Sequence, residues 1–215
     1  MLSLHRIRRY FDEAHYARLW AELTQSGLVW PLPLRIRLEN SPTAVWALAL
    51  RRVCELTHGS SAMTEELTDR LLHAQTPQGA WCDAEGREDP MLTALAAAAL
   101  HRRRLQPGIP PQQADHLSHQ HAAALAALAA IQDPCDGLFG DSAGGDGRKS
   151  ASLRVAEGCY VLFLLAEDPA ALNTLRLLPL RDALDEAAPG FDATLRETYD
   201  MATLLLECQA PALAA

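Results

Sequence analysis

The sequence has few aromatic residues, no excess of basic residues and no closely spaced pair of cysteines. Aromatic residues make up 6% of the 215 residues, while alanine and leucine are abundant, and this composition favours helix over sheet. The formal net charge is -8, so the phosphate backbone of a nucleic acid is expected to be repelled. The five cysteines include no CxxC pair and are odd in number, which excludes a complete disulfide framework and indicates a reducing compartment.

Long apolar runs are also missing. The longest wholly apolar stretch, residues 122–131, is about half of a membrane span, and the basic N-terminus lacks the apolar core of a signal peptide. A chain of 215 residues is long enough for one domain that buries about 70% of its unfolded surface. We therefore expect a soluble, cytoplasmic, all-α protein with no transmembrane segment and no nucleic-acid partner.

Strongly apolar segments alternate with amphipathic ones and predict stacked helical hairpins. Segments as apolar as 43–57, 90–104 and 150–167 form helices that must be buried on most sides. Further helices are expected at 64–75, at 112–132, in a shorter piece at 170–188 that Pro179 interrupts, and at 192–209. The expected organisation is a single domain, 1–215, made of an N-terminal outer helix (1–27), an extended connector (28–42) and helical hairpin repeats (43–209).

A QxxxGxW heptad, Gln75–Trp81, stands between an amphipathic and an apolar segment. Gln132–Phe139 repeats its order with one more residue between glutamine and glycine, and Gln25–Trp30 is a degenerate third copy. The glutamines are 57 and 50 residues apart (132 minus 75, 75 minus 25), a period typical of helical hairpin arrays. Glutamine can bond backbone groups freed at a helix end, glycine permits a tight turn, and tryptophan fills the gap between hairpins. We expect these residues to brace the fold rather than to touch a substrate.

This motif resembles the QW repeat of the terpene cyclase and protein prenyltransferase superfamily, as in squalene-hopene cyclases. In that repeat an acidic residue and Thr-Ala open the apolar inner helix, which here reads Asp89 to Thr93-Ala94 and, in the same frame, Glu39 to Thr43-Ala44. The resemblance covers residues from about 25 to 209 and implies an α/α toroid. About three inner/outer hairpins plus the N-terminal helix make the expected fold a partial barrel, which a second copy or a partner chain would complete.

The cyclase branch implies a cleft between inner helices that holds an isoprenoid or another hydrophobic substrate. Class II cyclases protonate an alkene with the middle acid of an Asp-x-Asp-Asp-Thr-Ala motif. Aligned on Thr93-Ala94, this chain has Met91 at that position, so the usual acid is absent. The candidate catalytic acids are Asp89, Glu39 and Glu157, and the candidates for contact with the substrate are Arg154, Tyr160, Met91 and Trp46.

The prenyltransferase branch implies a metal site. Arg154–Phe163 resembles the β-subunit stretch in which a lysine, followed by Asp-Gly-Cys-Tyr, supplies diphosphate binding and two zinc ligands. Arg154 takes the position of the lysine, Glu157 that of the aspartate and Cys159 that of the thiolate, while Asp200 takes the place of the third ligand, a histidine. The implied ligands are therefore Glu157, Cys159 and Asp200, with zinc or magnesium as the candidate cofactor although neither is clearly encoded.

Three functions remain open: a terpene-cyclase-like protein, a non-catalytic helical module that binds a protein partner or a lipid-like ligand, and a zinc-dependent prenyltransferase-like subunit that binds an isoprenoid diphosphate. Because Met91 occupies the position of the cyclase acid and the chain is short, the non-catalytic binding module is favoured.

Two further clusters are assigned to the surface. The histidine-rich run Asp115–His121 is expected to be solvated at the polar start of a helix, and the glycine-rich segment Gly144–Lys149 is expected to form a rim loop without P-loop spacing.

Overall fold

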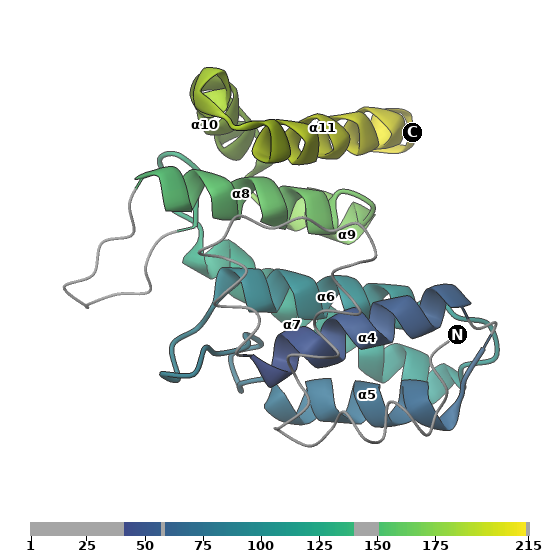
Figure 1. Cartoon of the computed structure of the whole chain (residues 1–215). Coiled ribbons are helices and arrows are strands. Elements are labelled where there is room, and N and C mark those ends of the chain that lie inside the picture. Colours follow the sequence, from purple (N-terminus) through teal and green to yellow (C-terminus); the bar gives the residue numbers. More distant parts are fainter. Residues whose placement is uncertain (1–40, 57–58, 140–150, 214–215) are drawn as a thin grey trace.

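The computed structural model describes residues 41–56, 59–139 and 151–213, and all regular structure within these ranges is helical apart from two isolated β-bridges (Figure 1). The prediction of an all-α protein is confirmed. The expected N-terminal helix 1–27, nearly all of the connector 28–42, Glu39 and the glycine-rich segment Gly144–Lys149 lie outside the described residues. No helix of the described part is long and apolar enough to cross a membrane.

The helices follow one another with short connections. They are α4 (Pro42–Leu56), α5 (Ala62–Ala74), α6 (Pro90–Arg104), α7 (Pro111–Ile131), α8 (Ala151–Leu165), α9 (Pro169–Thr174), α10 (Leu177–Ala187), the 3-10 turn η2 (Ala188–Gly190) and α11 (Ala193–Leu213). The expected break at Pro179 is wrong, because the helix breaks at 175–176 and Pro179 lies in the first turn of α10. A proline is tolerated there because the first turn of a helix does not use its backbone N–H groups.

Helix α6 is the centre of the described structure. Thirteen of its fifteen residues are buried, as the nearly continuous run of alanine and leucine predicts. It packs against α4 on one side and α8 on the other, and α8 in turn packs against α11. Three further helices each pack against one member of this row: α5 on α4, α7 on α6 and α10 on α8 (Figure 1).

The QxxxGxW turn between α5 and α6 is held by side-chain hydrogen bonds. Gln75 Nε2 donates to the carbonyl of Gly79 at 2.9 Å and to the carbonyl of Gln120 on α7 at 3.1 Å. Trp81 is fully buried, and its indole Nε1 donates to the carbonyl of Leu71 at 2.9 Å. Gly79 has a φ of +94°, which a residue with a side chain rarely adopts. The glutamine therefore ties its own turn to the next outer helix.

The second copy of the motif makes equivalent bonds. Gln132 Nε2 donates to the carbonyl of Gly137 at 2.7 Å and to the carbonyl of Arg176, immediately before α10, at 3.3 Å. Gln132 Oε1 also accepts from the backbone N–H of Arg176 at 2.8 Å. Gly137 also has a positive φ, +69°, and Phe139 is fully buried at the position of the tryptophan. The prediction that both motifs brace the fold is confirmed for these two turns.

Candidate functional site

The carboxylate of Asp89 caps the N-terminus of α6. Its Oδ1 accepts from the backbone N–H groups of Met91 at 2.8 Å and Leu92 at 3.1 Å, and the residue is 1% exposed. An N-cap aspartate satisfies backbone donors that the helix itself leaves free. Met91, which takes the position of the cyclase acid, is fully buried in the core.

Arg154 is held by carboxylates of the second motif turn. Its guanidinium Nη2 lies 3.1 Å from Asp136 Oδ1 and 3.5 Å from Asp133 Oδ2. A diphosphate at Arg154 would have to compete with these two acids. Tyr160 is 1% exposed, and burial is the main cause that raises the pKa of its hydroxyl to about 12.

The residues that the prenyltransferase resemblance assigns to zinc have different environments. Glu157 and Cys159 are fully buried on α8, whereas Asp200 is exposed on α11. Burial raises the pKa of the Cys159 thiol to about 12, which disfavours the thiolate that binds zinc. Among the described residues, these three do not form a group whose ligand atoms lie close enough to share an ion.

Cysteine alkylation measures these environments directly. We expect iodoacetamide to label the exposed Cys135 quickly, and to label Cys54 and Cys159 only after unfolding, because both are buried and burial raises their thiol pKa values to about 11 and about 12. Peptide mass spectrometry before and after EDTA treatment is the measurement. A Cys159 that becomes reactive in the folded protein when EDTA is added would instead indicate a metal-bound thiolate.

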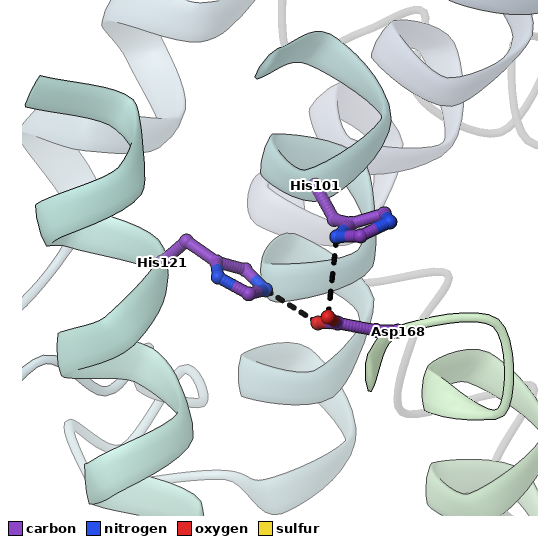
Figure 2. A group of neighbouring side chains, drawn as sticks. All are labelled: His101, His121 and Asp168. Carbon is purple, nitrogen blue, oxygen red and sulfur yellow. Dashed lines mark hydrogen bonds and ion pairs between the residues drawn. The ribbon is translucent and has the colours of Figure 1, made fainter. Parts of the chain in front are cut away.

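Three buried polar side chains from distant parts of the chain meet beside α6. His101 comes from the last turn of α6, His121 from the middle of α7, and Asp168 from the turn between α8 and α9 (Figure 2). His121 Nε2 lies 2.6 Å from Asp168 Oδ2, and His101 Nδ1 lies 3.3 Å from Asp168 Oδ1. The two imidazole ring centroids are 5.6 Å apart. We call these three residues the His–Asp–His cluster.

Asp168 is the centre of the cluster and is ionised. Burial alone would raise its pKa, but the hydrogen bonds from His101 and His121 outweigh burial and hold the pKa of this carboxyl well below its usual range. Asp168 Oδ1 also accepts from the backbone N–H of Ala170 at 3.0 Å, which caps α9. The carboxylate therefore joins α6, α7 and the α8–α9 turn.

His101 lies between an acceptor and a donor. Its Nδ1 faces the Asp168 carboxylate and is also 3.1 Å from Arg104 Nη2. A single ring nitrogen cannot donate to Asp168 and accept from Arg104 in the same tautomer. One of the two contacts is therefore unsatisfied at any moment, which leaves Nδ1 the least fixed atom of the cluster.

Only part of this cluster is signalled by a pattern in the sequence. His121 belongs to the run Asp115–His121, in which Asp115, His116 and His119 are exposed as expected. His121 instead follows the buried stripe of α7, four residues after Leu117 and four before Leu125. That spacing places it inside the protein, but its meeting with His101 and Asp168 depends on how α6, α7 and the α8–α9 turn pack.

Three cavities of the described part bear on the candidate residues. A cavity of about 770 Å³ between α4 and α5 has Trp46 in its lining, and one of about 300 Å³ lies between α5 and α7. A much smaller one, about 10 Å³, borders His101 and Asp168. That volume is about the minimum that holds one water molecule, so the His–Asp–His cluster has no room for an organic substrate.

Comparison with known proteins does not assign the chain to a family. No protein-family model, no curated protein and no solved structure matches it. Function is therefore inferred from the residues themselves, and the resemblance of the Gln75–Trp81 turn to QW repeats remains a prediction.

Proposed function

We propose that this chain is a non-catalytic helical-repeat binding module that takes a cationic segment of a partner protein in the cavity between α4 and α5. The observation that carries the proposal is this cavity, which combines an aromatic side chain with an acidic lining. It is lined by Trp46 of α4 and by Ala62, Glu65, Glu66, Asp69, Arg70, His73 and Ala74 of α5. Its volume of about 770 Å³ is in the range of ligand-binding pockets.

The scaffold of the module is proposed to be an arc of an α/α toroid. Lateral packing in the order α4, α6, α8, α11 supports an inner row, and α5, α7 and α10 support an outer row. The equivalent bonds of Gln75 and Gln132 support a repeated unit. In repeat proteins of this kind neighbouring units bury a continuous core and leave surfaces between helices for binding.

The charge of the cavity lining determines which kind of ligand the cavity attracts. Three carboxylates line the cavity, from Glu65, Glu66 and Asp69, and two guanidinium groups neutralise part of them, since Arg70 pairs with Glu66 and Arg103 pairs with Glu65. An excess of one carboxylate remains (three minus two). With the net charge of -8 for the chain, this environment attracts a cation and repels a diphosphate.

Trp46 supplies the aromatic part of the site. The guanidinium of Arg70 already lies 5.7 Å from the centre of the Trp46 ring, so the ring face is able to accept a cation. The indole Nε1 is buried and has no hydrogen-bond partner among the described residues, so a ligand carbonyl would satisfy it. A peptide with an arginine or lysine supplies both groups, the cation and the carbonyl.

Non-catalytic binding is favoured because the groups that the cyclase and prenyltransferase resemblances assign to chemistry hold the fold. Asp89 caps α6, Arg154 is paired with Asp133 and Asp136, and Cys159 is a buried thiol. Helix α6 is surrounded by packed side chains on nearly every face.

Fluorescence anisotropy with a labelled peptide that carries arginine and lysine tests the proposal. We expect Asp69→Asn combined with Glu66→Gln to weaken binding at least about tenfold, because the lining then changes from net negative to net positive. Added salt is expected to weaken binding to the wild-type protein. The matched control is Asp182→Asn combined with Glu186→Gln, which removes the same two charges from exposed positions of α10. Equal weakening by the two double variants, or no binding by the wild-type protein, contradicts the proposal.

Incubation with geranyl, farnesyl and geranylgeranyl diphosphate is the second arm of this test. Product analysis is expected to find only unreacted diphosphate. A product that disappears in Asp89→Asn, a variant that keeps a capping oxygen, would establish a cyclase instead.

A further inference from the structure

We propose that His101, His121 and Asp168 form a binding site for a divalent transition metal ion of the zinc class. The site is separate from the α4–α5 cavity and goes beyond the proposed binding function. The ligand atoms of all three side chains lie within 4.8 Å of one another, and all three residues are buried. Figure 2 shows both imidazole rings directed at the Asp168 carboxylate from different helices.

The donor set fits such an ion. Two imidazole nitrogens and one carboxylate oxygen are ligands that zinc and Fe²⁺ use in proteins, whereas magnesium and calcium prefer sites made only of oxygen. The cluster has no thiolate. Its three side chains would leave one of four coordination positions open, as in catalytic zinc centres.

An ion requires the three side chains to move. Ligands about 2.0–2.1 Å from a tetrahedral ion are about 3.3 Å from one another. His101 Nδ1 and Asp168 Oδ1 are already 3.3 Å apart, whereas His121 Nε2 lies 2.6 Å from the other carboxylate oxygen, Oδ2, in a direct hydrogen bond and must separate from it by about 0.7 Å. The three ligand atoms, which now lie within 4.8 Å of one another, must also come to about 3.3 Å from one another.

A fourth ligand has a place beside the cluster. The cavity of about 10 Å³ borders both His101 and Asp168 and has room for about one water molecule. Arg51 also lines this cavity, and its Nη1 is buried without a hydrogen-bond partner in the part of the chain that the structure describes. A water or hydroxide bound to the ion would accept a hydrogen bond from this Nη1 atom.

Arg104 opposes an ion, and so do the positive charges of Arg51 and Arg102, which border the small cavity. Arg104 Nη2 lies 3.1 Å from His101 Nδ1, the atom that the ion would take, and its positive charge repels a cation. Arg104 is half-buried at the last position of α6, and its long side chain can turn towards solvent. Removing Arg104 is therefore expected to tighten metal binding, an effect that a purely structural cluster would not produce.

The experiment uses the full chain freed of metal with EDTA. Calorimetric titration with zinc chloride is expected to show about one equivalent bound, and Co²⁺ is expected to give the visible absorption of a four-coordinate ion with nitrogen and oxygen ligands. His121→Asn and Asp168→Asn are each expected to weaken zinc binding at least about tenfold, and Arg104→Ala is expected to tighten it. The control is His119→Asn, because His119 is exposed on the same helix two residues away and is expected to leave binding unchanged.

Circular dichroism identifies variants that fail to fold. Absence of zinc binding by the folded wild-type protein overturns the proposal and leaves the cluster as a hydrogen-bonded link between helices. Zinc binding that persists in both His121→Asn and Asp168→Asn overturns it too, since the ion then lies elsewhere. If either variant unfolds, Arg104→Ala decides, because unchanged or weaker zinc binding by that folded variant rejects the site.

Discussion

Trp81→Ala lowers the free energy of unfolding by about 4 kcal/mol in a urea titration, the largest effect that we expect for a single side chain. Trp81 is fully buried between α5 and α6, and truncation leaves a cavity the size of its indole ring. It also removes the Nε1 donor that satisfies the carbonyl of Leu71. Both losses fall on the turn that joins the first two described hairpins.

Trp81→Phe is the matched control for this prediction. Phenylalanine keeps most of the ring, as the second turn shows by placing Phe139 at the equivalent position. The expected loss is about 1–3 kcal/mol, because the Leu71 carbonyl is left without its indole donor and some volume is lost. A Trp81→Ala loss below about 1 kcal/mol would mean that the ring does not fill a packed gap.

Gly79→Ala lowers the free energy of unfolding by about 3 kcal/mol, measured by the same titration. A Cβ at this position would lie 2.6 Å from the carbonyl carbon of Ala123 on α7, so the backbone of two elements must move. The positive φ of +94° adds the cost of a left-handed conformation. The turn and α7 approach too closely at this point for any side chain.

Gly86→Ala separates these two causes. Gly86 also has a positive φ, +77°, but no described residue lies within 4 Å of an added Cβ. Only the conformational cost of about 1 kcal/mol is expected there. Equal losses for the two variants would show that backbone conformation, and not close approach to α7, requires glycine at position 79.

Local signals in the sequence were sufficient to predict most of the helices. The bounds of α6 agree with the expected 90–104 because Asp89, Pro90 and the arginines at its end are all signals within one or two turns of the helix ends. The division of 169–187 into α9 and α10 was expected, but at Pro179 instead of at 175–176. The role of Asp168 as the N-cap of α9 was not recognised from the sequence.

The polar sites depend on packing and were less predictable. Resemblance drew attention to Arg154 and Cys159, but a linear motif does not show that Asp133 and Asp136 neutralise the arginine or that the core encloses the thiol. The His–Asp–His cluster joins residues 20 and 47 positions apart (121 minus 101, 168 minus 121), and no local periodicity links them. The spacing of the histidines in the sequence drew attention to His116 and His119, on the exposed face of α7, and not to the buried His121.

The hydrogen bonds of Gln75 and Gln132 impose an order of events during synthesis. Gln75 reaches a carbonyl 45 residues further along the chain, and Gln132 bonds a residue 44 further along. While the ribosome is still adding those residues, each completed turn lacks its second anchor and its glutamine remains bonded to water. At about 5–20 residues per second, this interval lasts a few seconds for each unit. A nascent chain therefore carries one unanchored turn at its growing end, which is the segment that a ribosome-associated chaperone would meet first.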